Sequence, residues 1–189
     1  MIYIHDDLGS ISKEEFEEMM AEMAESRRQK CLALRQETDR LQCAIAHRLL
    51  LKALREEFGI RDIPVWSFNP NGKPYLRDYP QIHFSLSHCK EAVACAVADH
   101  PVGIDVESLQ AYDSSLARYV CSDGEYEQLK SKEDAATAFC VLWTKKESLL
   151  KLRGESFPSR EQLSDLLENC NNKFHTLIHS RYVLSLCEE

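Results

Sequence analysis

Two acidic segments, at residues 103–107 and 143–151, constrain the fold of this chain more than any other feature of its sequence. In the first segment, aliphatic residues alternate with Asp105 and Glu107. A strand places alternate side chains on opposite faces, so both carboxylates are expected on one face of a strand. The second segment has helical character and carries Glu147. A chain that combines such a strand with such a helix is expected to have an α+β fold.

Composition limits the classes of protein to which the chain can belong. The 189 residues are 44% hydrophobic, which suffices for one sizeable core or two small ones. The formal net charge of −8 argues against bulk nucleic-acid binding, which needs a basic surface. No segment approaches the roughly 20 apolar residues that span a bilayer. The first residues lack the basic and apolar regions of a secretion signal. We expect neither a nucleic-acid partner nor a membrane association.

The eight cysteines indicate a reduced compartment. None belongs to a C-x-x-C pair, and Cys43, Cys95 and Cys140 lie within apolar segments. A free thiol in such a segment behaves as a small hydrophobic side chain. A disulfide scaffold is not expected at this chain length, so the sequence predicts a cytoplasmic protein with free thiols.

Helical and strand patterns alternate along the chain. Gly59 and Gly154 follow the two longest helical patterns and fit the position after a helix end. Ser131 with Asp134 resembles a capping box for the second of these helices. Each half contains helices and then a closing pair of strands, which favours two related α+β lobes, 1–102 and 103–189, over a single α+β domain. The expected helices are 12–25, 38–58, 131–153 and 159–170, and the expected strands are 2–5, 81–86, 92–98, 102–107, 173–178 and 181–187.

The acidic residues suggest a magnesium site. Magnesium prefers oxygen ligands and is usually held by one or two carboxylates together with substrate phosphates. Asp105, Glu107 and Glu147 are suitable ligands. Alternatively, the first two form the solvated face of an edge strand, and Glu147 makes an ordinary surface pair with Lys151 four residues later. Trp143 favours the magnesium site, because it places Glu147 at the margin of an apolar stripe, where a carboxylate is partly desolvated.

Basic residues elsewhere are candidates for binding an anion. Lys73 lies in a constrained Gly-Lys-Pro turn, and His88 ends a predicted strand directly after Ser87. Each of them is also compatible with an ordinary surface position. His175 and His179 have zinc-like spacing, but the segment has strand character and lacks the metalloprotease glutamate. A further group of basic residues near the N-terminus could meet a phosphate, and it includes Arg27, Lys30 and Arg40.

Four motifs in this order resemble one family, the 4′-phosphopantetheinyl transferases of the Sfp type. The resemblance covers about residues 25–155, and the combination and order of the motifs make it specific although each motif is weak alone. The motifs are Gly72-Lys73-Pro74, Phe84-Ser85-Leu86-Ser87-His88, Gly103-Ile104-Asp105-Val106-Glu107, and Trp143-Thr144-Lys145-Lys146-Glu147-Ser148 with Lys151.

The resemblance implies a pseudo-dimer of two similar α+β lobes with the active site in the cleft between them. It implies transfer of the phosphopantetheine arm of coenzyme A to a serine of an acyl or peptidyl carrier protein, with release of 3′,5′-ADP. Residue by residue, it implies that Mg²⁺ is bound by Asp105, Glu107 and Glu147, that Glu147 and Lys151 are catalytic, and that coenzyme A is bound by Lys73, Ser87, His88, Arg27, Lys30 and Arg40. A monomer is expected from an internal pseudo-dimer. The carrier is expected to bind near the cleft, largely through apolar residues of the second lobe around 111–130, including Tyr119, Val120 and Leu129.

Three departures from the family pattern leave these assignments in place. Ser85 stands where asparagine is common, Cys89 stands where a small hydroxyl residue is common, and a frequent second glycine after Gly154 is missing. They bear on carrier preference and fine nucleotide contacts. The alternatives are a non-catalytic module that binds coenzyme A or a carrier, and a different magnesium-dependent phosphate enzyme such as a nucleotide hydrolase. The absence of a P-loop motif disfavours the commonest class of such hydrolases.

Overall fold

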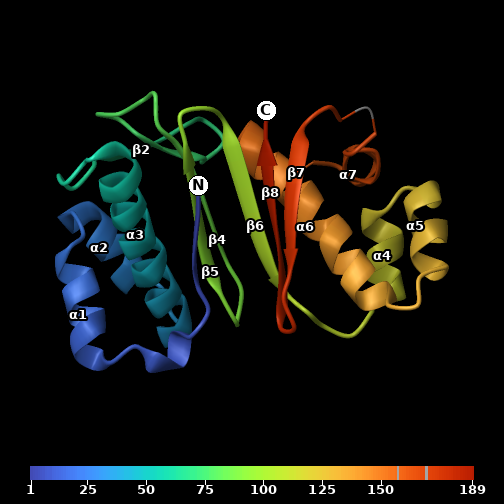
Figure 1. The fold of residues 1–189 in the computed structure, drawn as a ribbon, viewed down its shortest axis with the longest axis horizontal. Helices are drawn as coiled ribbons and strands as arrows, with labels where there is room; N and C mark the ends of the chain where they lie inside the picture. Colours follow the sequence, from blue (N-terminus) through green and yellow to red (C-terminus); the bar gives the residue numbers. More distant parts are fainter. Residues whose placement is uncertain (157, 169) are drawn as a thin grey trace.

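The computed structural model describes residues 1–156, 158–168 and 170–189, and helices and strands are mixed within them (Figure 1). The strands are β1 (Ile2–His5), β2 (Trp66–Phe68), β3 (Pro74–Leu76), β4 (His83–His88), β5 (Val93–Ala98), β6 (Val102–Ser108), β7 (Lys173–Ile178) and β8 (Tyr182–Glu188). The α-helices are α1 (Lys13–Ala21), α2 (Glu25–Leu32), α3 (Glu37–Phe58), α4 (Ser114–Val120), α5 (Asp123–Lys130), α6 (Ala135–Arg153) and α7 (Arg160–Ser164), and a short 3₁₀ helix spans Leu8–Ser10.

Two antiparallel sheets form the centre of the molecule (Figure 1). Their strand orders in the described residues are β1-β5-β4 and β6-β8-β7, while β2 and β3 form a separate hairpin. Ala94 and Ala96 of β5 pack in one cluster with Ile104 and Val106 of β6. Because the β5 side chains in this cluster are small, the two sheets can approach each other closely.

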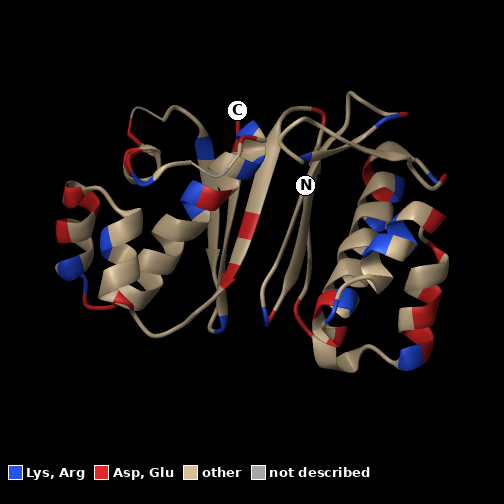
Figure 2. Cartoon of the chain, turned by 180° about the vertical axis from the view of Figure 1, so that it is seen from behind, with Lys and Arg blue, Asp and Glu red and all other residues tan. Residues whose placement is uncertain are grey.

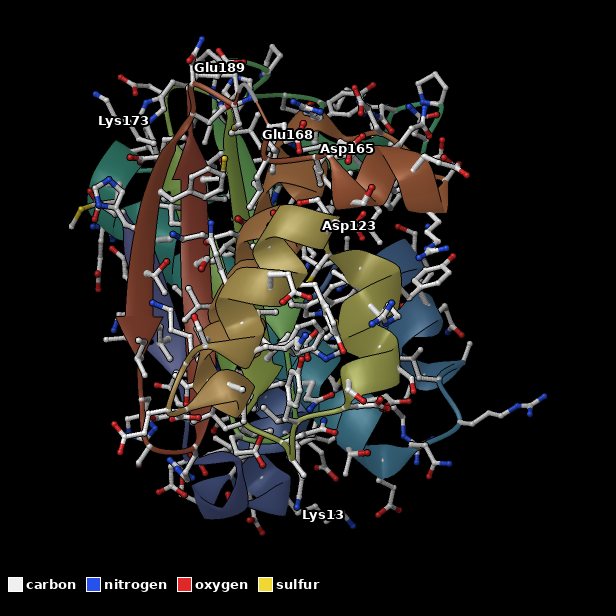
Figure 3. The ribbon with its side chains drawn as sticks, turned by 90° about the vertical axis from the view of Figure 1, so that its right-hand side faces the viewer. Lys13, Asp123, Asp165, Glu168, Lys173 and Glu189 are labelled. Carbon is white, nitrogen blue, oxygen red and sulfur yellow. The ribbon has the colours of Figure 1, made fainter. Side chains whose placement is uncertain are left out.

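The helices cover the sheets from opposite sides (Figure 1). Leu50 and Leu54 of α3 pack against Phe84 and Val97 of the first sheet. Helices α1 and α2 pack on α3. Helix α6 lies along β6 and β8, and α4, α5 and α7 gather at the far end of that half (Figures 1 and 3). Acidic residues are prominent on the outermost helices, α1 and α5 (Figure 2).

No helix in the described ranges has both the length and the apolar character that crossing a bilayer requires.

Helix α6 lies directly on β6 because Gly103 has no side chain. A Cβ atom added to Gly103 would overlap the carbonyl oxygen of Ser148 and the backbone nitrogen of Leu152, both in α6. These are backbone atoms, so no side-chain rotation could make room. The glycine therefore sets the distance between the strand that carries Asp105 and the helix that carries Glu147.

The expected ends of the long helices are confirmed. Helix α3 spans Glu37–Phe58, and Gly59 follows it in the left-handed conformation with a φ of 69°. Gly154 follows α6 in the same conformation with a φ of 62°. The expected cap at Ser131 is wrong, because Ser131 ends α5. Asp134 begins α6 instead, and its side chain accepts a hydrogen bond from the backbone N–H of Thr137.

Other boundaries differ from the sequence expectation. The helix expected over 12–25 ends at Ala21, and the basic residues after Glu25 belong to a further helix, α2, which was not predicted. Arg, Gln and Lys are good helix formers, and Arg28 and Gln29 both hydrogen-bond Glu25 one turn earlier. The helix expected to reach about Cys170 ends at Ser164. Helices α4 and α5 were not predicted.

Candidate active site

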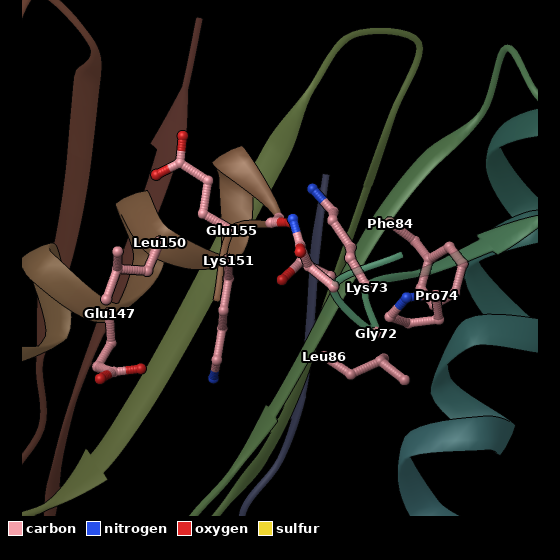
Figure 4. A pocket seen from close by; sticks show the side chains of 12 residues that line it. Gly72, Lys73, Pro74, Phe84, Leu86, Glu147, Leu150, Lys151 and Glu155 are labelled. Carbon is pink, nitrogen blue, oxygen red and sulfur yellow. The ribbon is translucent and has the colours of Figure 1, made fainter. Parts of the chain in front are cut away.

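Strand β6 and helix α6 bring the four predicted acid and lysine side chains into one neighbourhood. Asp105 and Glu107 are two residues apart on β6 and so share one face of the strand. Glu147 and Lys151 project from successive turns of α6 to the same side (Figure 4). Asp105 is only 2% exposed. The alternative in which Asp105 and Glu107 form a solvated strand face is therefore wrong.

Asp105 is held by two donors through one of its oxygens. Its Oδ1 accepts hydrogen bonds from the Lys151 ammonium at 2.6 Å and from the Ser87 hydroxyl at 2.9 Å. Its Oδ2 is buried and has no hydrogen-bond partner among the described residues. A buried carboxylate oxygen without a partner is costly, so this atom has unused capacity to bind a cation or a donor.

The other two carboxylates are destabilised in their charged form. Burial, followed by repulsion from Asp105, raises the pKa of Glu107, although its Oε1 accepts a hydrogen bond of 3.2 Å from the Trp143 indole. Burial and then the charge of Asp105 raise the pKa of Glu147 to about 7, against an opposing effect of Lys151. A bound cation would relieve the mutual repulsion of these three acids.

The three carboxylates provide the oxygen ligands that a magnesium ion prefers. No three His, Cys, Asp or Glu side chains in the described ranges are close enough together to hold a metal ion as they are placed, and Asp105 forms an ion pair with Lys151. The unpartnered Oδ2 of Asp105 and the raised pKa values of Glu107 and Glu147 nevertheless describe an oxygen-donor set whose negative charge Lys151 offsets only in part. A hard divalent cation prefers such a set.

A cavity of about 310 Å³ opens beside Glu147 and Lys151 (Figure 4). Residues of the β2–β3 turn and of β4 form one wall, and residues at the end of α6 form the other. The lining residues are Asn71, Gly72, Lys73, Pro74, Phe84, Ser85, Leu86, Glu147, Leu150, Lys151, Gly154 and Glu155.

Lys73 lies in this wall, and its ammonium is engaged with the end of α6. The ammonium donates to the Leu152 carbonyl at 2.7 Å, and burial lowers the pKa of Lys73. The side-chain amides of Asn69 and Asn71 donate to the Gly154 carbonyl at 3.0 and 3.1 Å. The predicted lysine turn therefore caps the helix that carries Glu147.

The remaining predicted residues lie at different distances from this cavity. His88 ends β4, and partial burial of its ring, followed by the charge of Lys151, lowers the pKa of His88. Arg27 stacks over Trp66 at 4.4 Å and Lys30 over Phe68 at 4.2 Å. Arg40 donates to the Leu34 carbonyl at 3.1 Å. None of Arg27, Lys30, Arg40 and His88 lines the cavity.

Sequence reasoning missed the contacts of two residues that shape the site. Trp143 anchors Glu107, as described above. Lys146, next to Glu147, is fully buried, and its ammonium lies 2.7–2.9 Å from four acceptors that share its three protons: the Glu125 carboxylate and the carbonyls of Val120, Leu163 and Ser164. Lys146 therefore joins α6 to the neighbouring helical segments. The position of Trp143, four residues before Glu147 on the same helix, could have indicated that its indole lies at the site. Nothing in the sequence distinguishes Lys146 from a surface lysine.

Comparison with known proteins points to one family. The family model of the 4′-phosphopantetheinyl transferase superfamily matches residues 101–185. A 4′-phosphopantetheinyl transferase of Bacillus subtilis is 30% identical over 148 residues, which cover 77% of this chain and 66% of the relative. The 4′-phosphopantetheinyl transferase psf-1 of Bacillus pumilus is 42% identical over 87 residues, covering 45% of this chain and 37% of the relative. The alignment with the first of these relatives thus spans just under two thirds of its length.

Proposed function

Because the chain belongs to the 4′-phosphopantetheinyl transferase superfamily, we propose that it transfers the 4′-phosphopantetheine arm of coenzyme A to a serine of an acyl or peptidyl carrier protein. The second product is 3′,5′-ADP, and the reaction depends on Mg²⁺. The single observation that carries this proposal is the convergence of Asp105, Glu107, Glu147 and Lys151, of which Glu147 and Lys151 line a cavity of about 310 Å³. Transfer of a phosphate-linked group requires positioning and charge neutralisation more than covalent catalysis.

The acids divide into two roles. Asp105, Glu107 and Glu147 would hold Mg²⁺, which neutralises charge on the pyrophosphate of coenzyme A when it is bound. Glu147, with its pKa of about 7, is also suited to accept the proton of the carrier serine, directly or through a water. The serine oxygen then forms the new bond to phosphorus while the bond from that phosphorus to the departing 3′,5′-ADP oxygen breaks. Lys151 stabilises the charge that develops on the phosphate oxygens.

The remaining residues of the site are proposed contacts of coenzyme A. His88 would meet the 3′-phosphate through a ring N–H, which an imidazole offers as a donor whether neutral or protonated. Lys73 borders the cavity and has an ammonium with three donors, of which the Leu152 carbonyl uses one at short distance. Arg27, Lys30 and Arg40 would contribute positive charge from α2 and α3.

We also propose that the chain consists of two related lobes, 1–102 and 103–189, and acts as a monomer. In support, each half contributes one three-stranded sheet, and β5 and β8 are the central strands of the two sheets. Each sheet packs against one long helix, α3 or α6. The cavity draws its lining from both halves, as expected for an active site in a cleft between lobes.

The test of the proposed function is the intact mass of an apo carrier protein after incubation with this protein, coenzyme A and Mg²⁺. A mass gain of one phosphopantetheine arm is expected. Glu147→Gln and Asp105→Ala should each slow the gain by at least about a hundredfold, because they remove the base or a metal ligand. No gain with several unrelated carriers, while coenzyme A still binds, would support a non-catalytic binding module instead.

We propose that the carrier docks on α4. The sequence suggested Tyr119, Val120 and Leu129 as contacts, but the last two are wrong, because they are 1% and 5% exposed and belong to the core. Leu116 and Tyr119 of α4 are 46% and 49% exposed. Leu116 and Glu107 also line one cavity of about 200 Å³, so a carrier on α4 would bring its serine close to the acids.

Leu116→Ala and Tyr119→Ala are expected to raise the KM for the carrier about fivefold or more and to leave the KM for coenzyme A unchanged, since exposed apolar anchors contribute to docking alone. Leu177→Ala, at an equally exposed leucine of β7, is the matched control and should change neither constant. An unchanged carrier KM in both α4 variants would rule out this surface.

A further inference from the structure

Two serine hydroxyls of β4 connect the first sheet to β6. The strands β4 and β6 belong to different sheets in the described part of the chain. The Ser85 hydroxyl accepts the backbone N–H of Ile104 at 3.0 Å, and the Ser87 hydroxyl accepts the backbone N–H of Val106 at 3.2 Å. Both serines are 6% exposed. The two side chains thus take the place that carbonyl oxygens of a paired strand would take.

Ser87 makes two further contacts that Ser85 does not make. Its hydroxyl accepts a hydrogen bond from the Lys151 ammonium at 2.8 Å and donates to Asp105 Oδ1 at 2.9 Å. A hydroxyl has one donor and two acceptor positions. Since the backbone N–H of Val106 and the ammonium can only donate, the single proton of Ser87 must be directed to Asp105.

All hydrogen-bonding capacity of the Ser87 hydroxyl is therefore used within the protein. The family resemblance assigns Ser87 to coenzyme A binding, and such a contact would require one of these three bonds to break. The carboxylate of Asp105, in contrast, depends on Ser87 for one of its two contacts. That contact turns Oδ1 towards β4 and leaves Oδ2 without a partner.

We propose that Ser87 is a positioning residue, which fixes the Asp105 carboxylate and the Lys151 ammonium relative to each other. Ser87 holds Asp105 in the rotamer that keeps Oδ2 available to a divalent cation. It also holds the Lys151 ammonium beside Asp105. Ser85 supplies the same link to β6 without any contact to the acid or the lysine.

This role rests on the proposed function, so its test uses Mg²⁺ alone and needs no carrier or turnover. Titration calorimetry would measure Mg²⁺ binding to the full chain without coenzyme A. Ser87→Ala is expected to weaken Mg²⁺ binding about tenfold or more, as loss of a partner that orients a metal ligand does. Ser85→Ala, the matched control, should bind Mg²⁺ within about twofold of the wild type, because it touches no ligand. Equal Mg²⁺ affinity of Ser87→Ala and the wild type would overturn the role.

A second measurement tests the same role without any metal. Thermal unfolding in a chelating buffer would compare Ser87→Ala, Lys151→Met and the double variant. If Ser87 positions Lys151 and Asp105 as one unit, the loss of Tm in the double variant is smaller than the sum of the two single losses. Additive losses would overturn the role. Failure of the proposed function would appear differently, as a wild-type protein that forms no product or binds no Mg²⁺ while the losses of Tm stay non-additive.

Discussion

Gly103→Ala is expected to cause the largest loss of stability of any glycine-to-alanine change in this chain. The new Cβ would overlap backbone atoms of Ser148 and Leu152, so α6 would have to move away from β6. Overpacking of a close contact costs about 1–3 kcal/mol or more, and a clash with helix backbone belongs at the upper end. We expect a fall of more than about 3 kcal/mol in the free energy of unfolding, measured by urea denaturation.

The matched control is Gly124→Ala in α5. A Cβ at Gly124 would meet nothing within 4 Å, and the position is helical and exposed. Alanine there should leave the protein equally stable or stabilise it by up to about 1 kcal/mol, since glycine is a poor helix former. If Gly103→Ala were as stable as this control, the close approach of α6 to β6 would be disproved. Transferase activity should fall with Gly103→Ala, because Asp105 and Glu147 lie on the two elements that separate.

Lys146→Met is the second change with a large expected effect. The ammonium of Lys146 is completely buried and has four acceptors, namely the carboxylate of Glu125 and three backbone carbonyls. Methionine fills a similar volume but leaves those acceptors without their donor. Removal of one partner of a buried ion pair typically costs about 3–5 kcal/mol, and we expect a loss of this size in urea denaturation.

The adjacent lysine provides the control for Lys146. Lys145 is only half-buried, and its ammonium lies 5.8 Å from the centre of the Phe174 ring. Lys145→Met should change the free energy of unfolding by no more than about 0.5 kcal/mol. Similar losses in the two variants would show that Lys146 is not the connection between α6 and the helical segments around it.

The sequence was most informative where a local strand or helix periodicity determines which side chains share a face. Alternation along 102–107 placed Asp105 and Glu107 together, and helical spacing placed Glu147 and Lys151 together. The structure has the strand and the helix where these patterns predicted them. Gly59 and Gly154 end their helices as expected, because only a left-handed conformation was needed there and glycine adopts it readily.

The sequence was least informative where tertiary contacts decide the outcome. Helices α4 and α5 have only seven and eight residues, too short for a clear periodic pattern. Val120 and Leu129 were therefore taken as exposed although they face the core. The sequence does not distinguish a buried lysine such as Lys146 from a surface lysine. The close approach of Gly103 to α6 depends on Ser148 and Leu152, which lie about 45 positions later in the chain.

The contacts of the 69–73 turn have a consequence for how the chain unfolds. The last turn of α6, which carries Lys151, has carbonyl groups satisfied by Asn69, Asn71 and Lys73, from a segment about eighty residues earlier in the chain. The C-terminal half alone would lack these donors, and its long helix would fray where Lys151 lies. Folding of the two halves is therefore coupled, and we expect a single cooperative transition in which the active site and the turn are lost together.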